Sequence, residues 1–227
     1  MSVELRGIGM TSQRTRDRLV ARLREAGIQD ERVLEVMRAT PRHIFVDEAL
    51  ASRAYEDSSL PIGFGQTISQ PFIVARMTEV LLKDFSPTRV LEVGTGSGYQ
   101  TSVLAQLVPE VYTVERIAGL QEQARQRLAR QLKLSNIRYK HSDGTWGWRQ
   151  YAPYDGILVT AAPEEVPQEL LNQLAEGGRL VIPVGRHPYF QELMVVEKGP
   201  GDSTRQWTVT SVAFVPMTGE AQRRGRD

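Results

Sequence analysis

The chain has no cysteine among its 227 residues. This absence excludes disulfides, thiolate metal sites and cysteine nucleophiles, and it is compatible with a reducing cytoplasm, where we expect the protein to be located. Histidine is scarce as well, and the three present, His43, His141 and His187, are nowhere at i,i+4 spacing. We therefore expect no metal site of the zinc type.

An excess of charge of one sign is also missing, since 28 basic and 27 acidic residues leave a net charge of +1. Broad electrostatic attraction to nucleic acid or to a membrane is therefore not expected. No apolar run approaches the ~18 residues of a membrane span, and the N-terminus lacks the apolar region of a signal peptide. A hydrophobic content of 41% is that of a soluble globular protein, and the length suits one domain.

A glycine-rich turn is the most informative stretch of the chain. Val90–Val93 reads as a buried strand, glycines follow at positions 94, 96 and 98, and a helical pattern begins at Tyr99. Dinucleotide-binding turns usually have the spacing G-x-G-x-x-G, whereas Gly94, Gly96 and Gly98 form G-x-G-x-G. With Glu92 two residues earlier, the turn suits a ligand that has an ammonium group and no phosphate, such as S-adenosylmethionine. The alternative is an ordinary tight turn between strand and helix.

Two further acids follow predicted strands. Glu115 ends the apolar run from Val111 and lies 21 positions after Gly94 (115 − 94), where an acid is placed to bind both ribose hydroxyls. Its alternative role is to cap the helix that starts near Ile117. Asp143 follows the strand Asn136–His141 and is able to accept a hydrogen bond from an adenine amine. The alternative there is an Asx turn with Gly144.

Strands and helices alternate along the rest of the chain. A doubly wound, mostly parallel sheet is therefore expected, with the last two strands as an antiparallel pair. Ligands bind beyond the carboxyl ends of such strands, and the glycine turn, Glu115, Asp143 and Thr160 all fall there. The remaining predicted strands are Tyr154–Thr160, Arg179–Pro183, Phe190–Glu197 and Gln206–Val215, and the predicted helices in this part are Ile117–Leu132 and Pro167–Leu174.

The N-terminal quarter is helical in pattern. A basic amphipathic helix is predicted from Ser12 to Ala26, and Asp30 is a good N-cap for a second helix. Residues 58–70 are polar and lack helical periodicity, so we expect a functional loop there. Pro71 opens a helix that runs to Lys83, with Ser69 or Gln70 as its cap. We expect a single domain, with a helical extension over residues 1–57 and a catalytic core over residues 58–227.

At this point the chain resembles the protein-L-isoaspartate O-methyltransferases, and the bacterial members most. The specific match is Gln66–Pro71, because the glycine turn is shared by many methyltransferases. Ser142 departs from the glycine that relatives usually have there. The other matching stretches are Pro41–Val46, Leu60–Gly63, Val90–Gly98, Asp143–Gly144, Ala152–Asp155 and Gly177–Gly185.

The resemblance implies a seven-stranded fold of the S-adenosylmethionine-dependent methyltransferase type. It also implies methyl transfer to the α-carboxyl of isoaspartyl residues in damaged proteins, and repair through a succinimide. Ser69 falls on the active-site serine of the family. Cofactor-contacting positions fall on Gln66, Thr67, Ile68, Glu115, Arg116, Asp143, Gly144 and Thr218, to which the turn adds Glu92, Gly94, Gly96 and Gly98.

The expected partners are isoaspartyl proteins and peptides, and we expect a monomer. Two other functions remain open. One is methyl transfer to a nucleic acid or a small molecule, although Thr160-Ala161-Ala162-Pro163 is not the N-P-P-Y-type loop of enzymes that methylate base amines. The other is a binding module without catalysis.

Overall fold

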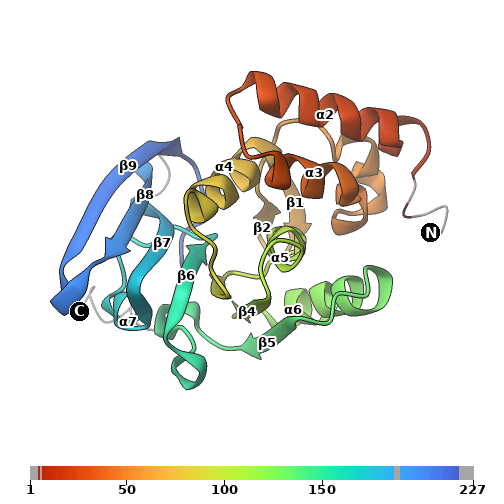
Figure 1. Ribbon diagram of the computed structural model, residues 1–227. Coiled ribbons are helices and arrows are strands. Elements are labelled where there is room, and N and C mark those ends of the chain that lie inside the picture. Colours follow the sequence, from red (N-terminus) through yellow and green to blue (C-terminus); the bar gives the residue numbers. More distant parts are fainter. Residues whose placement is uncertain (1–4, 6, 187–189, 220–227) are drawn as a thin grey trace.

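The computed structural model describes residue 5, residues 7–186 and residues 190–219. A seven-stranded sheet in the order β5-β4-β3-β6-β7-β8-β9 forms its centre (Figure 1). Strands β3 to β7 run parallel, and β8 and β9 are antiparallel to their neighbours, as the sequence predicted. The strands are β3 (Arg89–Val93), β4 (Glu110–Glu115), β5 (Ile137–His141), β6 (Tyr154–Val159), β7 (Leu174–Arg186), β8 (Phe190–Lys198) and β9 (Thr204–Val212).

Helices cover the two faces of the sheet unequally. The strands alternate their apolar side chains between two cores, so that Val90 faces one core and Leu91 the other. The first core receives side chains from α2 (Gln13–Glu25), α3 (Glu31–Ala39), α4 (Pro71–Leu82), α5 (Tyr99–Ala105) and α6 (Ala118–Arg125), which continues as the π-helical segment η4 (Gln126–Gln131). The second core is closed by α7 (Gln168–Asn172) and by aromatic side chains from the segment before β6.

Short 3-10 helices fill the connections between these elements. They are η1 (Gly9–Thr11), η2 (Arg42–Phe45), η3 (Glu48–Arg53), η5 (Gly144–Trp146), η6 (Arg149–Tyr151) and η7 (Pro200–Asp202).

The predicted loop over residues 58–70 is instead a small β-hairpin. Strand β1 (Leu60–Gly63) pairs antiparallel with β2 (Gln66–Ile68), apart from the main sheet. Gly63, Phe64 and Gly65 all have positive φ, which closes the turn in a conformation that glycine favours. Strands of four and three residues are too short for the alternation that identifies a strand in a sequence, so the prediction of a loop was wrong.

Several boundaries also differ from the prediction, most of all that of β7, which runs from Leu174 to Arg186 where the sequence predicted only Arg179–Pro183. Helix α7 ends at Asn172 rather than at Leu174, because Leu174 already pairs with Tyr154 as the start of β7. The predicted strand to Val215 ends at Val212, and the chain beyond it turns toward the carboxyl ends of the parallel strands.

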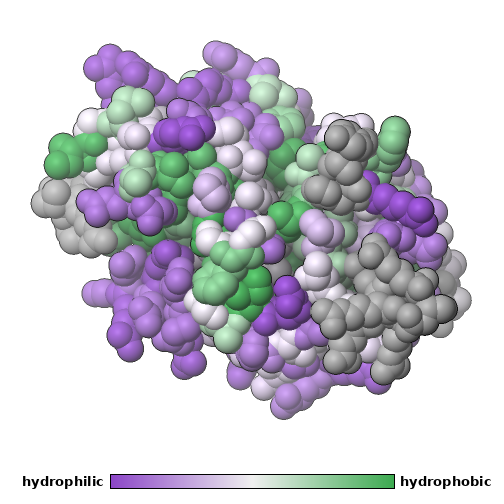
Figure 2. Space-filling view, turned by 180° about the vertical axis from the view of Figure 1, so that it is seen from behind, coloured by the Kyte–Doolittle hydropathy of each residue, from purple (hydrophilic) through white to green (hydrophobic). Residues whose placement is uncertain are grey.

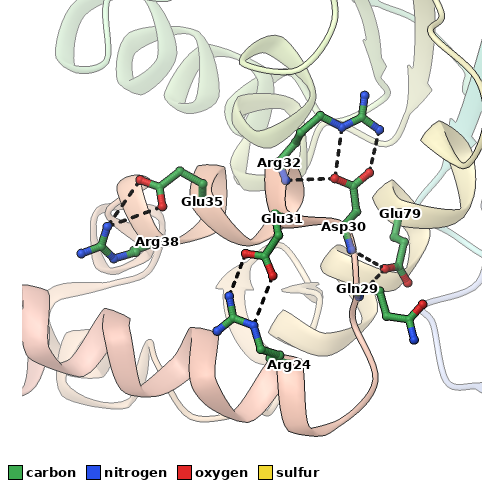
Figure 3. A network of polar contacts seen from close by, with 8 residues as sticks. All are labelled: Arg24, Gln29, Asp30, Glu31, Arg32, Glu35, Arg38 and Glu79. Atoms are coloured by element: carbon green, nitrogen blue, oxygen red, sulfur yellow. Dashed lines mark hydrogen bonds and ion pairs between the residues drawn. The ribbon is translucent and has the colours of Figure 1, made fainter.

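A polar network joins the N-terminal helices to α4 (Figure 3). Asp30 caps α3 by accepting a hydrogen bond from the Arg32 amide, as predicted. The Glu79 carboxylate on α4 accepts hydrogen bonds from the amides of Gln29 at 2.6 Å and Asp30 at 2.8 Å. These bonds satisfy main-chain donors at the turn between α2 and α3, so α4 and the N-terminal pair of helices are tied together at a partly buried contact.

Candidate active site

The three glycines of the turn have positive φ, at +97° for Gly94, +52° for Gly96 and +89° for Gly98. A Cβ at Gly94 would lie 2.3 Å from Oγ1 of Thr160, so β6 leaves room for no side chain there. A Cβ at Gly98 would press on Ala124 and Leu128 at 3.1 Å. The turn therefore lets the start of α5 approach both β6 and α6 closely, and it leaves the backbone around Gly96 open to a ligand.

A cleft of about 820 Å³, partly open to solvent, lies at the carboxyl ends of β3, β4 and β6. We call it the donor cleft. Of the predicted site residues, those that line it are Gln66, Thr67, Ile68, Ser69, Gly94, Gly96, Glu115, Arg116, Gly144 and Thr218. They come from the hairpin, the glycine turn, two strand ends and the chain after β9. The fold therefore brings together residues that are far apart in the sequence.

Glu92 does not line the donor cleft. Its side chain is fully buried, and one carboxyl oxygen accepts hydrogen bonds from Oγ1 of Thr101 at 2.5 Å and of Thr113 at 2.6 Å. The hydroxyl of Thr113 also forms a hydrogen bond with the hydroxyl of Thr95 in the glycine turn, at 2.6 Å between the two Oγ1 atoms. Burial raises the pKa of the Glu92 carboxyl to about 8, so it is mostly neutral at pH 7. The sequence suggested that Glu92 holds the ammonium group of a ligand directly or through water, and the geometry does not support the direct contact.

The carboxylate of Glu115 reaches both the turn and the next helix. One oxygen accepts a hydrogen bond from the amide of Gly96 at 2.9 Å, and the other accepts one from the amide of Ile117 at 2.8 Å. The helix-capping alternative is not found, since α6 has no side-chain cap bond and the bonded amide belongs to Ile117, the residue before the helix. The same side chain also lines the donor cleft. Two anchored oxygens leave the carboxylate little freedom to turn, and each keeps a lone pair for a ligand.

Asp143 is half-buried and is not among the residues that line the donor cleft. Its Oδ1 accepts a hydrogen bond from the amide of Thr145 at 2.9 Å, which is the Asx-type alternative. Its carboxylate also packs on Gly219, where a Cβ would come within 2.4 Å of both oxygens. Gly144 rather than Asp143 lines the donor cleft.

A second cleft of about 910 Å³ adjoins the first. We call it the acceptor cleft. The two clefts share Thr67, Ser69, Thr160 and Val215. The remaining lining residues of the acceptor cleft are Ser59, Gln70, Ile73, Ser211, Val212, Ala213 and Phe214. A group bound in one cleft and a group bound in the other therefore meet beside Ser69 and Thr160.

The chain after β9 forms one wall of both clefts. The amide of Ala162 donates to the carbonyl of Val215 at 2.9 Å, and the amide of Met217 donates to the carbonyl of Ala162 at 2.7 Å. Gln191 on β8 holds the same segment by accepting from the amide of Phe214 and donating to its carbonyl. The sequence carries no local signal for Gln191, because its partner lies 23 residues away.

Ser69 sits between β2 and α4, and it is not the cap of that helix. Gln70 occupies the N-cap position without a side-chain cap bond, and Asp57 accepts hydrogen bonds from the Phe72 amide at 2.8 Å and from Gln70 Nε2 at 3.1 Å. The predicted cap position is therefore confirmed for Gln70, but the side chain that bonds the Phe72 amide is that of Asp57, 15 residues earlier. Within the described residues the Ser69 hydroxyl makes no hydrogen bond.

A sequence model of the protein-L-isoaspartate(D-aspartate) O-methyltransferase family (PCMT) matches residues 14–222. The chain belongs to this family. A protein-L-isoaspartate O-methyltransferase of Halorhodospira halophila is 64% identical over 211 residues, which cover 93% of this chain and 94% of the relative. These findings confirm the resemblance that the segment from Gln66 to Pro71 had suggested.

Solved structures of the family share the fold. One protein-L-isoaspartate O-methyltransferase superposes with a TM-score of 0.81 at 29% identity, over 93% of this chain and 69% of that one. A Plasmodium falciparum structure described as a beta-aspartate methyltransferase (PCMT) in complex with S-adenosyl-L-homocysteine gives a TM-score of 0.78 at 26% identity, over 89% and 98%. The seven-stranded methyltransferase fold predicted for this family member is thereby confirmed.

The described part of this family member contains no group of three or more His, Cys, Asp or Glu residues that would hold a metal ion. His187 lies outside the described residues. Among the helices in the described ranges, none is both long and apolar enough to cross a membrane.

Proposed function

We propose that this chain transfers the methyl group of S-adenosylmethionine to the free α-carboxyl of L-isoaspartyl residues in damaged proteins and peptides. The methyl ester then closes to a succinimide, whose hydrolysis returns part of the damage to a normal aspartyl linkage. The observation that carries the proposal is the junction of the two clefts beside Ser69 and Thr160 in a member of this family. A donor in one cleft and an acceptor in the other meet there.

The residues of the donor cleft suit S-adenosylmethionine. Gly94 leaves no space for a side chain between the turn and Thr160, and the Glu115 carboxylate presents acceptors for ribose hydroxyls. Bound there, S-adenosylmethionine supplies an electrophilic methyl group on a positively charged sulfur. The residues proposed to hold it are Gln66, Thr67, Ile68, Gly94, Gly96, Glu115, Arg116, Gly144 and Thr218. Glu92, Gly98 and Asp143 support this wall from behind.

The acceptor needs no general base. A free carboxyl has a pKa of roughly 4 and is ionised at neutral pH, so the protein has to position it and remove water from it. Ser69 is the proposed catalytic residue. Its hydroxyl is uncommitted within the described residues, and it donates a hydrogen bond to one carboxylate oxygen so that the other points at the donor cleft.

Peptide recognition is proposed to rely on main chain rather than on side-chain pockets. The acceptor cleft runs between the hairpin and the chain from Ser211 to Val215, next to the edge strand β9. An extended peptide fits beside such a segment without a fixed sequence. We further propose that the protein acts as a monomer in the cytoplasm, with no nucleic acid or membrane as partner.

The test is a methyl-transfer assay on one synthetic peptide in isoaspartyl and aspartyl forms, with radiolabelled S-adenosylmethionine. We expect label in the isoaspartyl peptide only, as a base-labile ester. Equal labelling of the aspartyl form, or transfer to RNA offered in parallel, would contradict the proposed acceptor. Binding of S-adenosylmethionine without methyl transfer to any acceptor would instead favour the alternative that the protein is a binding module without catalysis.

A further inference from the structure

A buried arginine lies directly behind the junction of the two clefts. Arg42, in η2 of the N-terminal region, is fully buried. Its Nη2 donates to the main-chain carbonyl of Ser69 at 2.8 Å, and its Nε donates to the carbonyl of Ala54 at 2.8 Å. Its guanidinium carbon lies 4.8 Å from the ring centre of Tyr99, which lines the donor cleft. One side chain thus supports both Ser69 and the adjoining wall.

The positive charge of Arg42 is not neutralised by an ion pair within the described part of the chain. Its side chain interacts electrostatically with that of Tyr99, but within the described residues neither Nη1 of Arg42 nor the buried hydroxyl of Tyr99 has a hydrogen bond of regular geometry. Burial lowers the pKa of Arg42 to about 10, so the group is still a cation at neutral pH. A buried cation without a full set of partners costs stability, and its field is screened less than that of a surface charge.

The carboxylate that acts on Arg42 is that of Asp57, which lies before the hairpin in the sequence and packs against the N-terminus of α4. Asp57 interacts electrostatically with the guanidinium, and it caps the helix through the Phe72 amide. Without a nearby cation, this carboxylate would repel an anionic acceptor beside Ser69 and would offset the favourable field of the helix N-terminus. Asp57 is exposed whereas Arg42 is buried, so water weakens the field of the acid more than that of the arginine.

We infer that Arg42 is a positioning residue for the acceptor: it holds the main chain at Ser69 and supplies the positive potential that draws the isoaspartyl carboxylate there. Arg42 does not touch the substrate, because it is buried behind Ser69. The N-terminal region is thereby part of the acceptor site and not only a cover for the sheet. The inference rests on the proposed function.

The experiment compares Arg42→Met and Arg42→Lys with a matched control at the other end of α4. Arg179 also ties the main chain of α4, since its Nη1 donates to the carbonyls of Val80 at 2.6 Å and Lys83 at 2.9 Å. It lines neither of the two clefts. Arg179→Met therefore removes a comparable structural arginine without removing a charge from the site.

Each variant is measured for its melting temperature, its affinity for S-adenosylhomocysteine, and kcat and KM for the isoaspartyl peptide. The decisive readout is the affinity for that peptide relative to the same peptide with the α-carboxyl replaced by a neutral carboxamide. We expect Arg42→Met to raise KM about tenfold and to abolish the preference for the carboxylate. Affinity for S-adenosylhomocysteine should stay within about twofold. Arg42→Lys should keep part of the preference, and Arg179→Met should keep all of it.

Asp57→Asn provides an independent arm if Arg42→Met does not fold. The amide oxygen still caps α4 but the negative charge is gone, so the affinity for the isoaspartyl peptide should rise while that for the carboxamide should not. The inference is overturned if Arg42→Met shows the same preference for the carboxylate as the unaltered protein. If Arg42→Met does not fold, it is overturned when Arg42→Lys and Asp57→Asn both show that unchanged preference. If the unaltered protein methylates no isoaspartyl peptide, the proposed function fails instead.

Discussion

The Ser69 hydroxyl lies at the junction of the two clefts and forms no hydrogen bond with any other described residue. It is therefore available to a substrate. Ser69→Ala should lower kcat/KM for the isoaspartyl peptide by about 10- to 100-fold, the range of one hydrogen bond to a charged group. Stability should change by less than about 0.5 kcal/mol, because Asp57 caps α4. Steady-state kinetics and urea unfolding test both statements. Unchanged turnover would leave Ser69 without a catalytic role.

Glu92 makes stability depend on pH through its buried carboxyl. The folded group has a pKa of about 8, against 4.5 when it is exposed. Between these values the folded protein holds a proton that the unfolded chain has released, so the contribution of Glu92 to stability falls as pH rises. The slope is at most about 1.4 kcal/mol per pH unit and vanishes above pH 8. Glu92→Gln should remove it, since its amide oxygen is still able to accept from Thr101 and Thr113.

Urea unfolding at pH 5, 6, 7 and 8 measures this effect in the unaltered protein, in Glu92→Gln and in Glu122→Gln. Glu122 is an exposed residue of α6 and serves as the control. If Glu92→Gln shows the same pH dependence as the control, the buried carboxyl is not the titrating group.

At the scale of elements, the β1–β2 hairpin lies across the donor cleft. It contributes Gln66, Thr67 and Ile68 to the lining, and Ile62 lies 3.5 Å from where a Cβ on Gly96 would be. At its tip the ring of Phe64 rests on α6, so close that a Cβ on Gly119 would lie 2.7 Å from it. The hairpin therefore spans the cleft from α4 to α6, and we expect a bound donor to leave past it.

Phe64→Ala should speed the release of S-adenosylhomocysteine by up to about tenfold, because the contact with Gly119 is lost. Melting should hardly change, since the ring is 60% exposed. Gly119→Ala should act in the same direction by displacing the ring. Stopped-flow dissociation measures the rates, with Trp207→Ala on β9 as the control. Unchanged rates in both Phe64→Ala and Gly119→Ala would mean that the hairpin tip does not retain the ligand.

The larger elements were predictable from their apolar pattern and the residues that bound them, and the hairpin was not. Strand β3 is a short apolar run closed by the glycine turn, and helix α4 begins at a proline and carries apolar residues at helical spacing. Strands β1 and β2 are short, and Leu60 and Ile68 pair across a turn whose shape depends on three positive φ angles. Such a pairing is stabilised by the core in which Leu60 and Ile68 are buried, and local sequence does not report these neighbours.

For the whole molecule, the surface is mixed in character. Seen from behind, hydrophobic residues gather toward the middle of the face, and hydrophilic residues line most of its edge (Figure 2). The large hydrophobic side chains exposed among the described residues are Ile8 and Met10 beside each other at η1, and Phe64, Trp146, Phe190 and Trp207 in four other segments. Scattered exposed side chains of this kind are ordinary in a globular protein and define no partner.

The N-terminal region shares one core with the rest of the chain. Leu19, Leu34 and Phe45 are fully buried in the same cluster as Val90 and Tyr99. The fragment 58–227 would expose that apolar surface, and we expect it to lack a cooperative unfolding transition. Circular dichroism and urea unfolding of the fragment, beside the full chain, test this. A fragment with native-like stability would show instead that residues 1–57 are a separate unit.

Local sequence by itself determined the parallel sheet, the glycine turn and the meeting of Gly94, Glu115 and Thr160 at one edge. Strand periodicity and the right-handed connection of parallel strands leave few other arrangements. Only the tertiary structure decided that Glu92 supports the turn from below, that Asp57 caps α4, and that Arg42 stands behind Ser69. These roles depend on which side chains meet when distant segments pack, and spacing along the chain carries no record of such contacts.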